Sequence, residues 1–316
     1  MKNFKHFIFC VVVYLFSVDV MVAQNMKKEV SPFLEQIVTL FPNVRDIAMN
    51  ANETEAYFTA QSPLGEVSAI MQTKFMNGVW SKPEVVSFSG MYQDMEPFLS
   101  PNGLKLYFVS NRPTDNSVIE SKDFDIWFVE RKNVSGKWST PLNMGAPVNT
   151  KENEFYPSVA LSGNLYFTSD GILSKGKDDI FVCKFKNGKY ENPVSVSDSI
   201  NTDGYEFNAF IAPDESYMLF TCYNRKGGLG SGDLYISYNS GNGQWSGAEN
   251  LGTAINSRQM DYCPFVQPRT GMLYFTSKRS SLPDQFDENK STLELLKLMN
   301  QYENGWSRLY QVKFNQ

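Results

Sequence analysis

The sequence predicts an all-β protein in which small antiparallel sheets form a five-bladed β-propeller, and three recurring patterns support this. An aromatic pair recurs after a turn-like stretch at steps of 50, 59, 53 and 55 residues. A glycine followed two residues later by an aromatic side chain keeps nearly the same period, as does an Asp followed by two apolar residues. Four short strands per repeat, joined by Gly, Asn and Asp turns, are typical of one propeller blade. The aromatic pairs and their equivalent are Tyr57-Phe58, Tyr107-Phe108, Tyr166-Phe167, Leu219-Phe220 and Tyr274-Phe275.

Residues 1–23 carry the pattern of a secretory signal peptide. Lys2 and Lys5 precede an apolar run over residues 7–16, and small and polar residues lead to Ala23, after which we expect cleavage. The run is too short to span a bilayer comfortably, although an uncleaved N-terminal anchor is the alternative. Cys10 lies inside the apolar run rather than at the cleavage point, which argues against lipidation.

Export would leave a chain in which several kinds of chemistry are excluded. The one histidine, His6, lies in the signal segment, so we expect no Ser-His-Asp catalysis, no His-ligated zinc and no histidine pH switch. Removing Lys2, Lys5 and Asp19 leaves 27 basic and 33 acidic residues, which argues against a nucleic-acid partner. No later stretch reaches about 18 consecutive apolar residues. We therefore expect a soluble monomer, without a membrane span, in the periplasm or outside the cell.

Residues 24–316 are expected to form a single propeller domain, with six blades as the alternative to five. The last repeat contains an insertion, after which a third strand is expected over 307–314. Residues 30–41 precede the first blade and could supply the outer strand that the last blade lacks, which would close the ring. The blades are expected at about 42–93, 94–151, 152–203, 204–258 and 259–316.

The insertion in the last blade predicts a short helix over 292–302. Ser291 and Glu294 have the spacing of a capping box, and Leu293, Leu296 and Met299 fall on one helical face.

Three cysteines follow the signal segment, and an odd number in an exported protein does not suggest a disulfide framework. Cys183, Cys222 and Cys263 all lie in apolar, strand-like contexts. We expect buried small hydrophobic side chains, with one disulfide and a spare thiol as the alternative.

The repeats resemble those of TolB-type propellers, which carry a WD-like repeat. Residues 100–112 contain Ser-Pro-Asn-Gly, then Leu-Tyr-Phe, then Ser-Asn-Arg, and Asp125-Ile126-Trp127 matches the next strand of that repeat. Residues 212–214 and 233–235 repeat the match, as do residues 179–181. The resemblance covers nearly the whole chain after residue 23 and implies a propeller fold; TolB itself works through protein contacts, and related propellers serve as sensors, scaffolds and enzyme accessory domains. The pattern is similar to that of stand-alone exported bacterial propeller proteins.

An acidic position recurs at the start of each innermost strand except the first, where Val44 stands and Asp46 lies nearby. Propeller symmetry would bring equivalent positions round one mouth of the central channel, where like charges repel. Hydrogen bonds from the backbone of a neighbouring blade would offset this repulsion. The alternatives are a cation site, such as calcium held by oxygen ligands, and a catalytic carboxylate pair. The recurring acids are Asp94, Glu154, Glu206 and Asp261.

Basic side chains recur at the end of the second strand of the repeat. We expect inter-blade ion pairs there, with capture of an anionic ligand as the alternative. The Asp residues that begin the third strands are expected to form hydrogen bonds at turns or strand starts. The recurring arginines are Arg112, Arg225 and Arg279, and together with the four acids they are the candidate ligand-binding residues of the channel mouth and rim.

The sequence favours a non-enzymatic binding or scaffold module of the cell envelope over an enzyme. The glycine-rich run 227–232 precedes a strand instead of opening a helix, which argues against a nucleotide site. The expected partner is a protein or a glycan, and no cofactor is expected apart from the calcium alternative. The rival prediction is a glycoside hydrolase or lyase that works with carboxylates.

Overall fold

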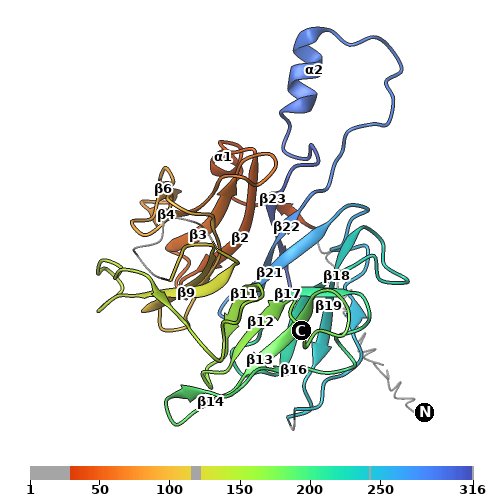
Figure 1. The fold of residues 1–316 in the computed structure, drawn as a ribbon. Helices are drawn as coiled ribbons and strands as arrows, with labels where there is room; N and C mark the ends of the chain where they lie inside the picture. The colour runs from red at the N-terminus through yellow and green to blue at the C-terminus, as the bar shows by residue number, and fades with distance from the viewer. Residues whose placement is uncertain (1–28, 115–121, 242, 315–316) are drawn as a thin grey trace, which may run out of the picture.

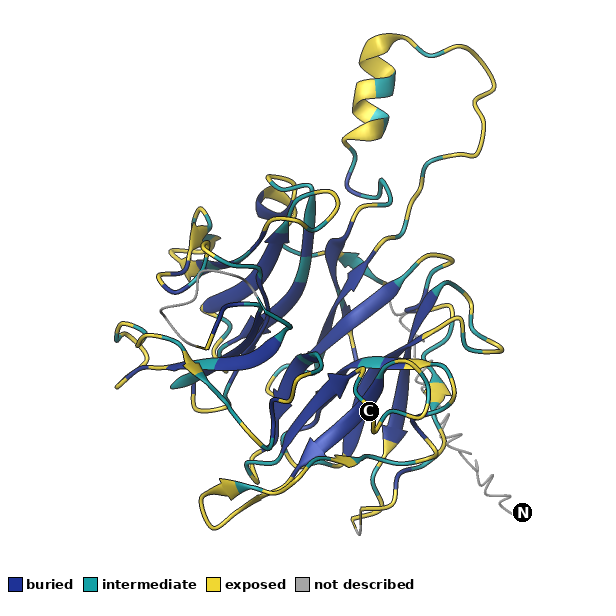
Figure 2. Cartoon of the chain, in the orientation of Figure 1, coloured by how far each residue is buried: buried dark blue, intermediate teal, exposed yellow. Residues whose placement is uncertain are grey.

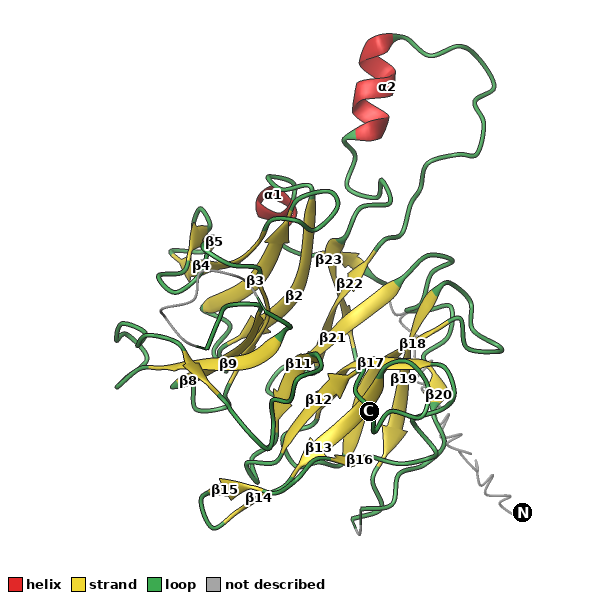
Figure 3. Cartoon of the chain, viewed as in Figure 1, coloured by secondary structure: helices red, strands yellow, loops and turns green. Residues whose placement is uncertain are grey.

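The structure is a computed structural model that describes residues 29–114, 122–241 and 243–314. The predicted signal peptide, residues 1–23, therefore lies outside the described residues. Antiparallel sheets fan out around a common axis, and the fold is a five-bladed β-propeller, as the sequence predicts (Figure 1). Figure 3 shows that almost all regular structure is strand.

Each blade begins at its innermost strand and runs outward along the sequence. The first blade consists of β2 (Asn43–Met49), β3 (Glu55–Gln61) and β4 (Ser68–Met76), with β5 (Val79–Trp80) and β6 (Glu84–Val85) both paired with β4. The second blade consists of β7 (Asp94–Leu99), β8 (Lys105–Ser110), β9 (Asp125–Glu130) and β10 (Leu142–Asn143).

The third and fourth blades repeat this order. The third consists of β11 (Glu154–Val159), β12 (Leu165–Ser169), β13 (Asp179–Cys183) and β16 (Val194–Ser195), and a separate hairpin joins β14 (Phe185–Lys186) to β15 (Lys189–Tyr190). The fourth consists of β17 (Tyr205–Ile211), β18 (Tyr217–Tyr223), β19 (Gly232–Tyr238) and β20 (Glu249–Asn250).

The fifth blade is completed by the N-terminal part of the chain. Its strands are β21 (Asp261–Gln267), β22 (Met272–Ser277), β23 (Arg308–Lys313) and β1 (Ser31–Pro32). Ser31 lies opposite Gln311 in an antiparallel pair, so the residues before the first blade supply the outer strand, as predicted. The short helix α1 (Glu35–Val38) then leads into β2. Joining the two ends of the chain in one sheet covers the open edge of β23.

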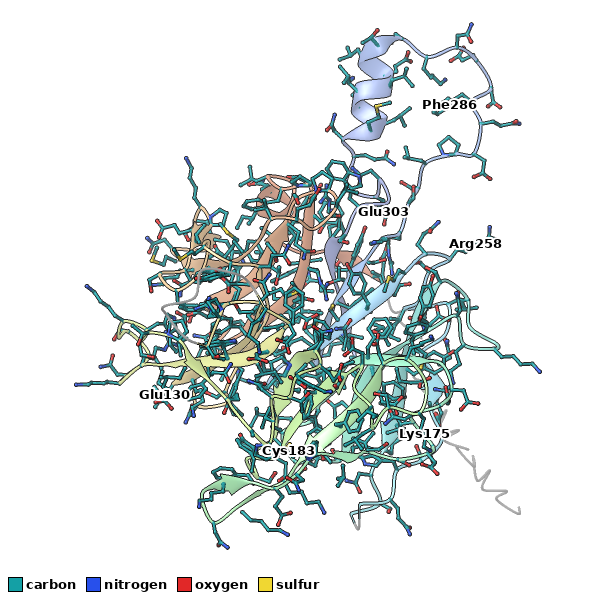
Figure 4. All side chains as sticks on the ribbon, in the orientation of Figure 1. Glu130, Lys175, Cys183, Arg258, Phe286 and Glu303 are labelled. Atoms are coloured by element: carbon teal, nitrogen blue, oxygen red, sulfur yellow. The ribbon has the colours of Figure 1, made fainter. Side chains whose placement is uncertain are left out.

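The predicted helix of the last blade is α2 (Thr292–Met299), which ends three residues before the expected position. Ser291 and Glu294 form the capping box that the sequence predicts. The helix stands away from the ring on a long connection between β22 and β23, on which Phe286 lies (Figures 1 and 4). The apolar side chains that share one face are exposed by 63%, 50% and 62% at Leu293, Leu296 and Met299.

Apolar side chains are buried between neighbouring blades. One cluster joins Tyr57 and Ile70 of the first blade to Leu106, Phe108 and Trp127 of the second, and similar clusters lie between the other blades. Figure 2 shows buried inner strands and exposed loops. Because both faces of each sheet are covered, the strands are apolar almost throughout, as the aromatic repeats predict.

The three described cysteines are buried and free, which confirms the expectation of small buried side chains at Cys183, Cys222 and Cys263. Within the described ranges, no helix is long and apolar enough to cross a membrane.

The ring has two ends, which we name here. The turn face carries the turns between the first and second strands of each blade. The connection face, at the opposite end, carries the loops between second and third strands, the blade-to-blade connections and α2. The recurring acids begin the innermost strands and so lie on the connection face.

Candidate functional site

The four recurring acids are buried, with at most 1% of each residue exposed. A serine or threonine four or five residues earlier donates a hydrogen bond to each, as Thr202 does to Glu206 through its N–H at 2.7 Å and its hydroxyl at 2.8 Å. The donors belong to the blade-to-blade connections, and for Glu154, Glu206 and Asp261 they include a backbone N–H of a residue that the sequence analysis assigned to the preceding blade. The pairs are Ser89–Asp94, Thr150–Glu154, Thr202–Glu206 and Ser257–Asp261.

Arg112 pairs with Asp94 within the second blade, where the sequence analysis expected a pair between blades. Its Nη2 lies 2.5 Å from Asp94 Oδ1 and 3.0 Å from the Phe88 carbonyl oxygen, and its Nε donates to Ser110 Oγ at 2.9 Å. The guanidinium carbon also lies 5.0 Å from the centre of the Phe108 ring. The charge is thus held by a carboxylate, a carbonyl, a hydroxyl and an aromatic face.

Arg279 repeats this arrangement in the fifth blade. Its Nη2 lies 3.0 Å from Asp261 Oδ1 and 2.9 Å from the Ile255 carbonyl oxygen, and its Nε donates to Ser277 Oγ at 3.0 Å. Its guanidinium lies over two rings that face each other across β22 and β23, Phe275 and Tyr310. We call this set of acid, carbonyl, serine and paired rings the arginine socket.

The other two recurring acids, Glu206 and Glu154, have no close arginine partner. Arg225 lies 3.9 Å from Glu206 and has a side chain that is 24% exposed. Glu154 has no arginine, because Gly171 stands at the position that Arg112 and Arg279 occupy in their blades. Burial raises the pKa of Glu154 to about 7, against the lowering effect of the Thr150 hydrogen bonds.

Residues of all five blades meet near the axis, two positions after the recurring acids on the innermost strands, and the sequence analysis placed only Asp46 among them near the channel mouth. Each lies at a β-bulge with a positive φ near 50°, and no residue type is shared. We call these residues together with Arg45 the axis cluster. Its bulge members are Asp46, Glu96, Tyr156, Asn208 and Cys263.

Hydrogen bonds across the ring join the axis cluster. Arg45 Nε donates to Asp46 at 2.9 Å, and its Nη2 donates to Glu96 at 2.7 Å. The Tyr156 N–H donates to the second oxygen of Glu96 at 2.7 Å, and the Tyr156 hydroxyl donates to the Pro264 carbonyl at 3.0 Å. Burial raises the pKa of Glu96 above its usual value, whereas Arg45 lowers it.

Hydroxyl groups on second strands also connect neighbouring blades near the axis. Thr59 accepts the Glu96 N–H at 3.0 Å, and Thr276 accepts the Asp46 N–H at 3.2 Å. In the second blade Val109 stands at this position and has no hydroxyl to accept a hydrogen bond. The Tyr156 N–H of the third blade therefore donates to the Glu96 carboxylate. The carboxylate of Glu96 therefore replaces the missing hydroxyl. These bonds assign the axis cluster a role in holding the blades together.

The turn face contains an apolar cavity of ≈ 270 Å³ to which all five blades contribute. One apolar wall residue from each blade is Met49, Phe98, Val159, Phe210 and Phe265. A second cavity, of ≈ 640 Å³, shares Leu161 and two prolines with the first. Together they form a hollow at the channel mouth opposite the recurring acids.

Among the described residues, no group of three or more His, Cys, Asp or Glu side chains is placed to hold a metal ion. Calcium binding at the recurring acids stays a prediction. The Asp residues that begin the third strands form local hydrogen bonds, as expected. For example, Asp233 accepts hydrogen bonds from the N–H groups of Leu229 and Gly230.

Comparison with known proteins places the chain by its fold. No family model matches it, and no curated protein matches it. The BT0996 protein, solved in an RGII complex, is 7% identical, with a TM-score of 0.56, over 88% of this chain and 93% of that protein. An α-L-arabinofuranosidase from Podospora anserina, in complex with cellotriose, is 10% identical, with a TM-score of 0.51, over 87% of this chain and 92% of the enzyme.

TolB from Acinetobacter baumannii is also similar, at 14% identity and a TM-score of 0.47, over 85% of this chain and 54% of TolB. At such identities a likeness shows the fold alone, which enzymes and TolB proteins share. The sheet order of the structure confirms the five-bladed propeller that the resemblance implies, and membership of a TolB-type family stays a prediction.

Proposed function

We propose that this chain is an exported, non-enzymatic module of the cell envelope that binds a protein or a glycan at the hollow of its turn face. The observation that carries the proposal is the apolar cavity built by all five blades at one channel mouth. Concave apolar sites with a few polar groups at the rim are typical of binding sites.

The state of the acids supports binding over catalysis. Asp94 and Asp261 are held by arginines, and Glu96 shares Arg45 with Asp46. A glycosidase needs two carboxyl groups that flank a substrate. Because these acids are buried and bonded to groups of the chain itself, we assign them to the stability of the ring.

A photo-crosslinking amino acid at Leu161 tests the proposal. Leu161 lies between the two cavities and is 69% exposed, whereas Met91 is 85% exposed in a connection on the other face and serves as the matched control. We expect the probe at position 161 to form a defined adduct with one envelope protein or glycan, and the probe at position 91 to form none. An adduct at position 91 alone, or none at either position, would contradict binding at the turn face.

The second candidate is a carboxylate-based glycoside hydrolase, and one observation favours it. Asp46 and Glu96 meet at the axis, and the raised pKa of Glu96 suits a general acid. Turnover of aryl α-L-arabinofuranosides or related substrates that disappears in Glu96→Gln and Asp46→Asn would establish this function and overturn the first.

A further inference from the structure

The third blade contains an arginine socket without an arginine of its own. Glu154 lies opposite Ser169, as Asp94 lies opposite Ser110 and Asp261 opposite Ser277. Two residues after the serine the second and fifth blades have Arg112 and Arg279, and the third blade has Gly171. The chain therefore supplies the acceptors for a guanidinium group without supplying the group.

The remaining parts of the socket surround a cavity of ≈ 140 Å³. Phe167 and Phe181 face each other across β12 and β13, as Phe275 and Tyr310 do in the fifth blade. Val148 stands six residues before Glu154, where Phe88 and Ile255 present their carbonyls to arginines in other blades. All of these third-blade residues line the cavity, which far exceeds the roughly 10–15 Å³ that one water molecule requires.

Of the four recurring acids, all of which lie within the described residues, Glu154 is the one without an arginine within 4.0 Å. Its two hydrogen bonds both come from Thr150, although a carboxylate has about four acceptor positions. Asp123 and Asp125 lie near enough to raise its pKa further, and Lys122 pairs with both of these acids rather than with Glu154. In the first blade the arginine is also absent, with Ser62 at its position, but there Val44 replaces the acid.

We propose that the cavity beside Glu154 binds the guanidinium group of an arginine side chain carried by a partner polypeptide. The flat guanidinium lies over the two phenylalanine rings and donates to Glu154, to Ser169 and to the Val148 carbonyl, as Arg279 lies over Phe275 and Tyr310 and donates in its own blade. A lysine ammonium lacks the planar fork that this set of acceptors matches. The site is on the connection face and is independent of the proposed turn-face binding.

The rim of the cavity favours a polypeptide over a small guanidinium compound. Ile172 and Leu173 line the cavity and are 94% and 63% exposed, which gives a partner chain apolar surface beside its arginine. A free guanidinium compound is the other source of the same chemistry, and the experiment separates the two.

Calorimetric titration with acetyl-Leu-Arg-Leu amide and with ethylguanidinium tests the site, with acetyl-Leu-Lys-Leu amide as the cation control. We expect the arginine peptide to bind, Glu154→Gln to weaken binding at least about tenfold, and Gly171→Arg to abolish it by filling the cavity from within. Gly171→Ala is the matched control: its Cβ would lie 3.2 Å from the movable Ser169 hydroxyl, and the φ of Gly171 is outside the left-handed region. It should bind the peptide within about twofold of the parent protein.

Gly171→Arg should also raise the unfolding temperature, because the new side chain pairs with Glu154. Equal binding of the arginine and lysine peptides, or unchanged binding in Glu154→Gln, overturns the proposal. Replacing Ile172 and Leu173 with serine should weaken the binding of the arginine peptide and leave the binding of ethylguanidinium unchanged. If the arginine peptide binds no better than ethylguanidinium, the proposal that the partner is a polypeptide is wrong.

Discussion

Replacing Arg112 with methionine is expected to lower the free energy of unfolding by about 3–5 kcal/mol. The substitution leaves Asp94 fully buried with its charge, and the Ser89 hydroxyl still donates to it. It also removes the donors to Ser110 and to the Phe88 carbonyl. Removing one partner of a buried ion pair costs far more than the pair contributes, because the remaining charge stays desolvated. Urea denaturation at neutral pH measures the loss.

Arg225→Met is the matched control for Arg112→Met. Arg225 is the recurring arginine of the fourth blade, but it lies one residue further along than Arg112 does, its guanidinium lies 3.9 Å from Glu206, and its side chain is partly exposed. A partly solvated pair of this kind contributes about 0–1 kcal/mol. Equal losses for the two variants would show that the socket geometry does not determine the stability of the ring.

Arg45→Met is expected to have a comparable effect at the axis, about 3–5 kcal/mol at pH 8. Arg45 is the cation that the structure places against both Asp46 and Glu96, which are 1% and 4% exposed. Without it, two buried carboxylates from neighbouring blades face each other. Urea denaturation of both proteins at several pH values checks the size of the loss.

The loss in Arg45→Met should shrink as the pH falls. Burial raises the pKa of Glu96, so the folded protein takes up a proton there more readily than the unfolded chain. Such a group stabilises the fold at low pH, and that contribution is lost as the pH rises through the folded pKa. Protonated Glu96 needs no cation, so at pH 5 the loss should be smaller, with the part that comes from the lost Asp46 pair remaining. Adding Glu96→Gln to Arg45→Met should restore much of the stability at pH 8, and no recovery would contradict this account.

The sequence predicted the blades because each aromatic pair and turn recurs with one period. It also placed Asp94, Glu154, Glu206 and Asp261 in equivalent positions, which the strand register bears out for each. Their ligand binding stays a prediction. Their hydrogen-bond partners were not predictable from composition, because they come from connections whose course depends on the closed ring.

The axis cluster escaped prediction for a physical reason. Asp46, Glu96, Tyr156, Asn208 and Cys263 share a backbone conformation and no side-chain chemistry, and a repeat of side chains does not reveal a positive φ. The missing arginine of the third blade, in contrast, is visible in the sequence. Aligning Arg112 with Arg279 places Gly171 in the same column, in the blade whose acid, Glu154, has no arginine partner.

The outward course of α2 was also not predictable. Ser291 and Glu294 predict where the helix begins, but an apolar face formed by Leu293, Leu296 and Met299 ordinarily indicates burial. The helix carries this face into solvent, because the connection between β22 and β23 leads away from the ring (Figure 1).

Amide hydrogen exchange along β23 tests the closed ring, on which the sockets, the axis cluster and the turn-face hollow all depend. The Phe33 N–H donates to the Leu309 carbonyl, so by strand alternation the Gln311 amide faces β1, while the Tyr310 and Val312 amides face β22. A ring closed by β1 predicts that all three amides exchange slowly. Fast exchange at Gln311, with slow exchange at Tyr310 and Val312, would mean that β23 is an open edge and that the ring is not closed by the N-terminal strand.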